Sequence, residues 1–560
     1  MSNSPEFSDC HEVDVLVLGG GIAGTRAALA AHHAGARVAH AYLARGASPF
    51  VIGANVPLGH EGVGDTAAAY AADMLAGGYQ LGDHSLVHTL AQQSVPAFEA
   101  LASCDIPFVR NAQGYRQRHL SGNRYARSVY VPKGTGQALL AGLDQALAAS
   151  SCLRFAGHEV VSLLTDDTGV EGALLRQRHQ EKVVSVRART TIIALGGVGR
   201  LYGDTTYPAD IHGDSFRLAL EAGAQLVDME FMQFEPVVTY CPAGARGMEM
   251  PTAMLGDGAH LLNRHGERFM FRYNPDHGEK NIEKARMALC IAEEVAAGRG
   301  LEGGTVRFDT TVLAPEVLES YVQHCKRLRH AGLDPAKIGP LVRPAAHSIM
   351  GGIRVDATGF TQVNGLYACG EAAGGFHGAS RIAGNGAGEA MAMGWVVGQH
   401  AAQNALEQSQ SRPWRIEAAR QRARVQLQPS FALNAHVVAD EAATITQSIR
   451  HIMDQHAGLF RDQQGLDLGL QQLDPLLPQI QKLPVTTLAL WLQQRRLYGL
   501  WLQAKIILRA ARLRSESRGA HQRRDYPKQD DNNWRLHLAW SLPSQSSVPV
   551  VARLKVQTEL

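Results

Sequence analysis

A glycine-rich segment near the start of the chain has residue types and spacing suited to binding a pyrophosphate. The first glycine of a G-x-G-x-x-G pattern allows a tight turn, the second lets the backbone approach the phosphates, and the third lets a helix pack closely on a strand. The helix N-terminus then presents free N–H groups to the anion. We predict a dinucleotide site here; a plain tight turn is the alternative. The predicted contacts are Gly19, Gly20, Gly21, Ile22, Ala23 and Gly24.

The flanking residues predict the elements that would position this loop. An apolar strand over residues 13–18 precedes it, and a small-residue helix runs from Thr25 to about His33. A second strand follows over residues 36–42, which completes a βαβ unit of a parallel sheet. The end of that second strand should offer Asp or Glu to a ribose hydroxyl. It reads His40-Ala41-Tyr42-Leu43 instead, so we expect the ribose to be held in another way.

The rest of the chain divides by composition. Three alternating runs over residues 158–189 predict an antiparallel meander inserted in the α/β domain, and glycine density returns over residues 365–389. Between them, a segment rich in Phe, Met and Pro predicts an inserted cap. The predicted domains are residues 12–230 and 343–402 for the two parts of the nucleotide-binding domain, 231–342 for the cap, 403–514 for a helical domain and 515–560 for a polar tail.

Composition excludes several classes of protein. The 560 residues are enough for two or three domains, and the formal net charge of +2, without a basic stripe, argues against a nucleic-acid partner. Seven cysteines without a C-x-x-C pair predict free thiols and no metal site. We see no signal peptide and no apolar run of about 18 residues, so we expect a cytoplasmic protein without a transmembrane segment.

Several separated blocks then resemble one flavoprotein family, that of succinate dehydrogenase, fumarate reductase and L-aspartate oxidase. The resemblance implies an α/β fold with a doubly wound FAD-binding domain that carries the inserted β-meander, an α+β capping domain and a C-terminal helical domain. It also implies FAD as cofactor. The blocks are GDSFRLALEAGAQLVDMEFMQFEP (213–236), GERFM (266–270), HSIMGGI (347–353), GLYACGEAAGGFHGASRIAGN (365–385) and SRGAHQRRDYPKQDDNNW (517–534).

The resemblance carries flavin contacts over to particular positions of this chain. Asp214 also has a structural alternative, as the N-cap of the helix that follows it. Respiratory members of the family tether FAD through a histidine shortly after the second strand, and residues 45–50 contain none, so we expect non-covalent FAD. The implied contacts, beyond the first loop, are Gly196, Gly197, Asp214, Glu371, Asn385, Gly386 and Ala387.

Three residues match the family's catalytic and carboxylate-binding positions. Arg286 falls where the family has a proton-transferring arginine; its alternative is a structural arginine that bridges to Glu283. His347 and Arg381 match the family's clamp for a substrate carboxylate. A guanidinium grips a carboxylate through two parallel hydrogen bonds, and an imidazole can donate a third.

Two departures from the family pattern bear on the substrate. Glu235 replaces the histidine that helps to bind the distal carboxylate of a C4 dicarboxylate, and the segment around Thr252 lacks the family's glutamate. Like charges at about 4 Å cost several kcal/mol in a partly dry site, so a second carboxylate is disfavoured unless Glu235 is protonated. A substrate with one carboxylate and one amine or hydroxyl fits better, with its donor end toward Glu235. The alternative places Glu235 in a structural network.

We therefore expect an FAD-dependent oxidoreductase that moves a hydride between flavin and a small carboxylate-bearing substrate, such as an amino acid or an unsaturated acid. One alternative is a flavoprotein subunit of a larger redox complex, with an iron–sulfur or other electron-transfer partner. Another is an FAD-binding scaffold without turnover. The sequence leaves the oligomeric state open.

Overall fold

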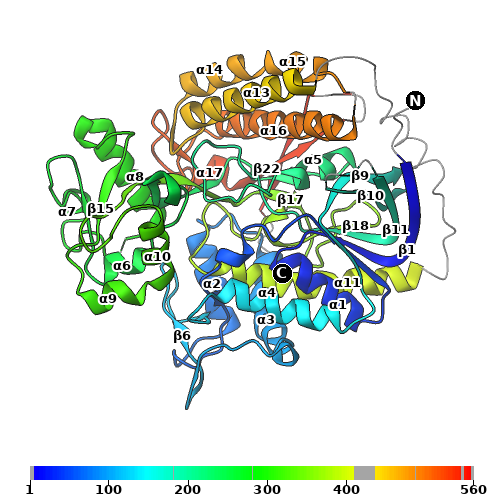
Figure 1. Cartoon of the computed structure of the whole chain (residues 1–560), viewed down its shortest axis with the longest axis horizontal. Coiled ribbons are helices and arrows are strands. Elements are labelled where there is room, and N and C mark those ends of the chain that lie inside the picture. Colours follow the sequence, from blue (N-terminus) through cyan, green and yellow to red (C-terminus); the bar gives the residue numbers. More distant parts are fainter. Residues whose placement is uncertain are drawn as a thin grey trace.

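The computed structural model describes residues 6–178, 180, 182–280, 282–408, 435–485, 487–543, 546 and 548–556. Its largest sheet has the strand order β8-β2-β1-β11-β10-β9, with β18 also paired to β11 (Figure 1). Apolar side chains of residues 13–18 are buried, as expected for a central parallel strand. The parallel strands are β1 (Glu6–Leu18), β2 (Val38–Tyr42), β8 (Leu153–Ala156), β11 (Lys182–Ile193) and β18 (Leu366–Ala368).

Two helices of small residues pack together beside this sheet. They are α1 (Ile22–His33) and α11 (Asn385–Gln408). A Cβ on Gly394 would lie 2.6 Å from the Ala23 carbonyl oxygen, and one on Gly398 would lie 2.4 Å from that of Ala27. Glycine at both positions therefore permits the close approach of the two helices. The other helices in the first half of the chain are α2 (Ala67–Gly77), α3 (His84–Glu99), α4 (Thr135–Ala148) and α5 (Asp214–Glu221).

The inserted meander is present and joins the main sheet. Its strands are β9 (His158–Asp166), β10 (Gly169–Gln177) and β11, paired antiparallel in that order. The sequence suggested separate strands before and after Arg189. The third run of the meander, expected to end at Arg189, continues through the next residues to Ile193 and forms with them the single strand β11, which pairs antiparallel with β10 in its first half and parallel with β1 along its length.

A second layer of structure contains a four-stranded sheet in the order β13-β16-β15-β14 (Figure 1, green). Its strands are β13 (Met232–Cys241), β14 (His260–Leu262), β15 (Val306–Asp309) and β16 (Leu341–Ile349). Helix α8 (Lys284–Glu294) packs against β13 and β16, and its buried Met287 and Ile291 belong to the core of this layer. The smaller helices are α6 (Thr252–Gly256), α7 (Met270–Tyr273), α9 (Pro315–Ser320) and α10 (Val322–His330).

A layer of helices lies above the main sheet in Figure 1. These helices are α13 (Ala435–His456), α14 (Gln463–Leu473), α15 (Leu476–Lys482) and α16 (Leu488–Leu513). Thr487 caps α16, since its hydroxyl accepts from the Leu490 N–H. Leu497, Trp501 and Leu508 are buried along that helix. The stretch 409–434 of the predicted helical domain lies outside the described residues.

The C-terminal residues, expected as a polar tail, add two strands to a third sheet. That sheet has the order β19-β17-β12-β22-β23. It consists of β12 (Leu226–Val227), β17 (Gly352–Arg354), β19 (Ala373–Gly374), β22 (Leu536–Ser541) and β23 (Val550–Lys555). The short remaining elements are η1 (Ser48–Phe50), β3 (Ala54–Asn55), β4 (Arg110–Asn111), β5 (Gly114–Tyr115), β6 (Gln117–Arg118), β7 (Ser128–Val129), β20 (Phe460–Arg461), β21 (Gln522–Arg523) and α17 (Asp531–Trp534).

The predicted fold class is confirmed: a parallel sheet of the doubly wound type with an inserted meander, a capping layer and C-terminal helices. Among the described helices, none combines the length and the apolar character needed to span a membrane.

Candidate active site

The first glycine loop has the geometry that the pattern predicts. Gly19 has φ +131°, and a Cβ there would lie 2.0 Å from the Ala194 carbonyl oxygen. A Cβ on Gly24 would lie 2.1 Å from the carbonyl oxygen of Gly19, so both positions require glycine. Helix α1 begins at Ile22, with no side-chain cap from Gly21 and no acidic residue in its first turn. Its positive end is therefore suited to a phosphate.

His40 occupies the place where the sequence pattern expects a ribose-binding acid. Its side chain is buried, and its Nε2 donates to the carbonyl oxygen of Gly19 at 2.8 Å. Burial lowers the pKa of His40 to about 4, so the ring is neutral at pH 7. His40 therefore braces the glycine turn.

Glu371 lies beside the second glycine segment and joins it to β16. Its Oε1 accepts from the Ser348 hydroxyl at 2.9 Å, from the Ile349 N–H at 3.1 Å and from the Tyr207 hydroxyl. A Cβ on Gly197 would lie 2.8 Å from this oxygen. Burial raises the pKa of Glu371, which these hydrogen bonds oppose. A flavin contact of Glu371, Gly196 or Gly197 stays a prediction.

Asp214 begins α5 rather than capping it. The N-cap is Gly213, with φ +73°, and no side-chain cap is formed. The Asp214 carboxylate pairs with Arg217 at 3.0 Å and with Arg496 at 3.6 Å. Its place in the first turn still suits a carboxylate, because the helix dipole is positive there.

The start of α11 lies against the predicted carboxylate clamp. Asn385 Oδ1 accepts from Asn55 Nδ2 and from the Tyr70 hydroxyl, both at 2.8 Å. A Cβ on Gly386 would lie 2.9 Å from Nη1 of Arg381, so glycine leaves room for the guanidinium. Ala387, the next residue, is buried. This end of α11 therefore shapes the space around Arg381.

The structure brings His347 and Arg381 together. Arg381 Nη2 donates to His347 Nε2 at 3.3 Å, and His347 Nδ1 lies 2.9 Å from the Thr206 hydroxyl. A guanidinium only donates, so Nδ1–H is the donor to Thr206. Burial lowers the pKa of His347 to about 4, and Arg381 and Lys284 favour the neutral ring further. The buried Nε of Arg381 has no partner among the described residues, so the clamp retains an unused donor.

Glu235 lies next to this clamp in a group of three charged side chains, here called the acidic cluster: Glu235, Glu249 and Lys284. Lys284 Nζ lies 2.8 and 2.9 Å from the two oxygens of Glu235 and 2.9 Å from Oε1 of Glu249. The Glu235 side chain is 2% exposed, whereas that of Glu249 is 34% exposed. The cluster thus reaches from the buried interior toward solvent.

The two carboxyl groups of the acidic cluster differ in proton affinity. Burial and the neighbouring Glu249 raise the pKa of Glu235 to about 8, against the lowering effect of Lys284. Burial also favours a raised pKa for Glu249, but Lys284 and His347 outweigh it and lower that pKa. The pair titrates jointly, and one proton resides mainly on Glu235 near neutral pH.

Ligand atoms of Glu235, Glu249 and His347 lie within 4.8 Å of one another, a spacing that could suit a metal ion. Lys284 Nζ already bonds both carboxylates and supplies the compensating charge. A cation would have to displace that ammonium group.

Arg286 and Thr252 do not join this constellation. The Arg286 side chain is 52% exposed and faces Glu293 at 3.8 Å. Residues two apart on a helix point about 200° from each other, and it is Lys284 that enters the cluster. Thr252 begins α6 partly buried, and within the described ranges no hydrogen bond joins its side chain to the cluster.

Sequence reasoning therefore missed Lys284 and Glu249. The buried side chains of α8 include Met287, Ala288 and Ile291. Lys284 precedes Met287 by three residues and Ala288 by four, so it shares their face. The spacing of apolar residues along this helix could therefore have identified Lys284 as a residue of the buried face. Glu249 reaches the site through a bridge between its backbone and Val238, which no local pattern indicates.

Comparisons with known proteins agree with this geometry. The FAD binding domain family matches residues 14–387, and the fumarate reductase flavoprotein C-terminal family matches residues 446–560. A chain of the fumarate reductase (CoM/CoB) of Methanothermobacter marburgensis is 30% identical, over 93% of this chain and 96% of that protein. L-aspartate oxidase of Agrobacterium fabrum is 32% identical, over 85% and 84% of the two chains.

A solved structure shows the same fold. The FrdA chain of Escherichia coli quinol fumarate reductase, in a single-substitution variant, aligns over 99% of this chain and 98% of its own, with a TM-score of 0.88 and 25% identity. The succinate dehydrogenase Sdh1 of Mycobacterium smegmatis aligns over 98% and 95%, with a TM-score of 0.86 and 26% identity.

The residues fit the cofactor of these proteins. The N-terminus of α1 suits a pyrophosphate, with only its Ile22 N–H engaged by a side chain of the described residues, the Ser48 hydroxyl at 2.9 Å. Buried polar atoms without partners, on Arg381, Asn385 and Gln233, lie among the residues that resemble the family's flavin and substrate site. The chain is an FAD-dependent oxidoreductase and belongs to the flavoprotein family of fumarate reductase, succinate dehydrogenase and L-aspartate oxidase.

Proposed function

We propose that this enzyme transfers a hydride between FAD and a small substrate that carries one carboxylate and, at its other end, an amine or a hydroxyl. The acidic cluster carries this proposal, because it sets two carboxyl groups and one lysine beside the carboxylate clamp. An amino acid or a hydroxy acid has the matching pair of ends.

Arg381 and His347 would hold the substrate carboxylate. The guanidinium offers two parallel donors, and its unpartnered Nε shows that its donor capacity is not exhausted. His347 adds a third donor if its proton moves to Nε2. Thr206 permits this change, since a hydroxyl can donate to Nδ1 as readily as accept from it.

The acidic cluster would hold the other end and reject a second carboxylate. Lys284 has three donor hydrogens, and its three short contacts engage the oxygens of Glu235 and Glu249. A dicarboxylate would bring a third carboxyl group to one lysine whose three hydrogens are already engaged, so its second carboxylate would lack a cationic partner whether or not Glu235 holds its proton. An ammonium or hydroxyl group instead donates to the oxygens of Glu235 and leaves Lys284 in place.

Bound FAD supplies the hydride acceptor or donor. In the oxidative direction Glu235 would take the N–H or O–H proton of the substrate, while the C–H hydrogen would leave with its electron pair as hydride to the cofactor, so that a C=N or C=O bond would remain. Lys284 keeps the Glu235 carboxylate oriented. Glu249 is partly exposed and is hydrogen-bonded to the same ammonium group. The proton would pass from Glu235 by way of Glu249 to solvent. The reductive direction reverses these transfers.

Anaerobic mixing of the FAD-loaded protein with a panel of amino acids, hydroxy acids, succinate and fumarate tests the proposal. We expect an amino acid or hydroxy acid to bleach the visible flavin absorbance, while succinate does not. Flavin reduction by succinate, with no response to any substrate of the proposed class, would refute it. The variant Arg329→Gln serves as a control, since its side chain lies on the cap surface and pairs with Glu319.

We further propose that FAD is held non-covalently. The segment where some family members carry the tethering histidine contains Ser48, Pro49 and Phe50 here, in the short helix η1. Acid precipitation should leave all of the flavin in the supernatant. Flavin that stays with the protein pellet would contradict the proposal.

A second candidate role is that of a flavoprotein subunit whose electrons pass to an iron–sulfur or similar partner. The match of residues 446–560 to the fumarate reductase flavoprotein C-terminal family favours it, as does the similarity to the fumarate reductase flavoprotein subunit of Haemophilus influenzae. Purification from the native cell, followed by iron analysis, tests it. Stoichiometric iron with a second chain supports the role, and an iron-free single chain with full activity argues against it.

A further inference from the structure

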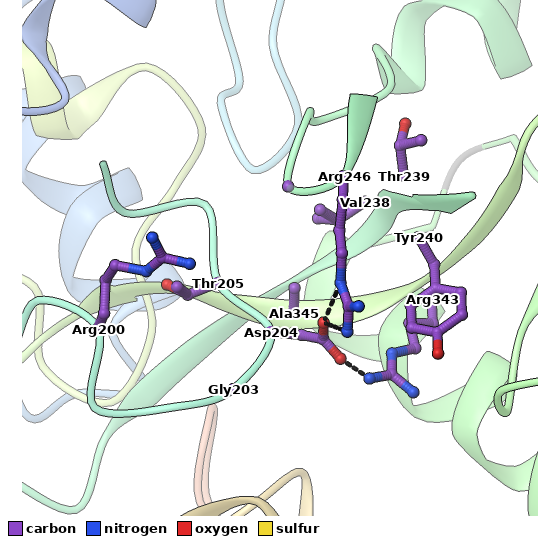
Figure 2. Close-up of a pocket in the computed structure, with 11 residues that line it drawn as sticks. Arg200, Gly203, Asp204, Thr205, Val238, Thr239, Tyr240, Arg246, Arg343 and Ala345 are labelled. Carbon is purple, nitrogen blue, oxygen red and sulfur yellow. Dashed lines mark hydrogen bonds and ion pairs between the residues drawn. The ribbon is translucent and has the colours of Figure 1, made fainter. Parts of the chain in front are cut away.

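A second polar site lies apart from the acidic cluster, at the seam between the main sheet and the cap. It is a cavity of about 130 Å³. Its walls come from the loop after β11, from β13 with the turn that follows it, and from β16 (Figure 2). Three guanidinium groups line it, those of Arg200, Arg246 and Arg343, together with one carboxylate, that of Asp204. We call this the arginine pocket.

Asp204 holds two of the three arginines. Its Oδ1 accepts from Arg246 Nε at 3.2 Å and from Nη2 at 2.8 Å, and its Oδ2 pairs with Arg343. The two guanidinium groups also lie over the ring of Tyr240, each 4.4 Å from its centroid. The contacts fix both arginines in place with their charges directed at one carboxylate.

The positive charge of the arginine pocket exceeds the negative charge within it. Arg200 lies apart from the pair in Figure 2, and no ion pair or hydrogen bond of its guanidinium is found in the described part of the chain. The nearby Asp454 carboxylate accepts from the Gly203 N–H at 3.0 and 3.1 Å, and Arg450 adds a further guanidinium beside it. Burial lowers the pKa of Arg343, and the nearby Asp454 opposes this shift.

We propose that the arginine pocket binds a tetrahedral oxyanion such as phosphate. Fixed guanidinium groups from separate segments of the chain are the groups that proteins use for such ions, because their donors match the oxygens in pairs. A cavity of about 130 Å³ accommodates one phosphate group, whereas pockets for whole drug-sized ligands begin near ~300 Å³. Asp204 is the internal competitor, since it occupies the donors that the anion would take.

The bound group could be free phosphate or the phosphate of a small ester whose remainder lies in solvent. The cavity is open to solvent at Arg246, whose side chain is 50% exposed. The loop that carries Asp204 continues to Thr206, whose hydroxyl bonds His347. The site is thus built on the same loop and strand as the carboxylate clamp.

Isothermal titration of the FAD-loaded protein with inorganic phosphate, with glycerol phosphate and with chloride at constant ionic strength tests the proposal. We expect saturable binding of phosphate and none of chloride. Tighter binding of glycerol phosphate would identify an ester as the ligand, and equal or weaker binding would identify the free ion. Absence of saturable phosphate binding would overturn the proposal.

Three variants make the test specific to this pocket. Arg246→Gln should weaken phosphate binding by about tenfold or more, because a charge-assisted pair of donors is lost. Arg200→Gln should weaken it by a smaller factor, and the loss should not unfold the protein, because this exposed side chain makes no hydrogen bond or ion pair among the described residues. Asp204→Asn should strengthen binding, because the competing charge is removed.

Arg329→Gln, on the surface of α10, is the matched control and should bind phosphate like the wild type. Equal affinity in the wild type, Arg200→Gln and Arg246→Gln would place any phosphate elsewhere on the molecule and refute the proposal.

Discussion

Two groups of glutamate and basic side chains in the described part of the chain differ in the ratio of carboxyl groups to basic groups. In the acidic cluster, Glu235 and Glu249 share Lys284, and Glu249 is 34% exposed. In the second group, which we call the C-terminal network, Glu230 and Glu516 pair with Arg514 and Arg518, and all four side chains are 0% exposed.

In the C-terminal network each of the two glutamates has an arginine partner. Both oxygens of Glu516 accept from Arg518, and one of them also accepts from the Asp530 N–H at 2.8 Å. Arg514 reaches Glu230 at 2.6 Å and the carbonyl oxygens of Trp534 and Leu536 at 2.8 Å. It thus ties the C-terminal residues to the chain just before β13. A network in which each carboxylate has an arginine partner fixes charges and geometry, whereas two carboxyl groups on one lysine leave a proton that can move.

The largest expected effect follows from removing the mobile proton. Glu235→Gln keeps the shape of the side chain but cannot accept a proton, so flavin reduction by substrate should fall about 10²- to 10⁴-fold. Unfolding by denaturant should be little changed, because a buried acid becomes a buried amide. Stopped-flow absorbance measures the rate. A rate within about threefold of the wild type would assign Glu235 to a structural role.

Removing an arginine from the C-terminal network should lower the free energy of unfolding rather than the rate of flavin reduction. Arg514→Ala leaves the buried Glu230 without its arginine and Glu516 with Arg518 alone, and should lower the free energy of unfolding by about 3–5 kcal/mol. Urea denaturation of the FAD-loaded protein measures it. Arg512→Ala is the control, since this side chain is 45% exposed and pairs with Asp467 at the surface. An equal loss of unfolding free energy in both variants would show that the C-terminal network contributes no more to stability than a surface ion pair.

Substrate binding at the carboxylate clamp should depend on the planar arrangement of the Arg381 donors as well as on their charge. Arg381→Lys retains one positive charge but loses the planar pair of donors, so substrate binding should weaken about 10- to 100-fold with FAD retained. Titration of the flavin spectrum with substrate measures the affinity. Arg286→Lys, on the exposed side of α8, should bind substrate normally. Loss of FAD from Arg381→Lys would show that the residue supports the cofactor.

The smallest expected effect is a shift in the pH midpoint of the rate of flavin reduction, which should occur when Lys284 is replaced and not when Arg286 is replaced. Glu235 must be ionised to accept a proton, and its raised pKa of about 8 means that this form gains population as the pH rises. The rate of flavin reduction should therefore increase about tenfold per unit below pH 8 and level off above it. Lys284→Met removes the charge that favours the carboxylate, so the midpoint should move upward by about one unit. Arg286→Met should leave the midpoint unchanged.

A flat pH profile in the wild type, or an equal shift in Lys284→Met and Arg286→Met, would contradict the proton transfer assigned to the acidic cluster. The pH profile of Glu235→Gln provides the reference, because this variant should lack the increase in rate that follows the ionisation of Glu235.

The sequence by itself determined the elements whose causes are local. Gly24 is dictated by the carbonyl of Gly19 in the same loop, and the order of the strand, glycine and helix signals was enough to predict the nucleotide loop. The family resemblance of several short blocks was enough to predict the fold class. His347 and Arg381 were named from short motifs, and the structure places them 3.3 Å apart. The substitution of Glu235 for a histidine was also visible without the structure.

Tertiary structure decided the features that depend on which face of a helix meets the site and on contacts between residues far apart in the sequence. Arg286 and Lys284 are two residues apart, and only the orientation of α8 against β13 determines which of them enters the site. Glu249 joins Glu235 because its backbone bridges to Val238, a pairing across a loop that no sequence period encodes. Asp204 likewise meets Arg343, 139 residues later, only because the loop after β11 lies along β16. Charge can be counted from the sequence, but whether it is compensated depends on which side chains fold against it.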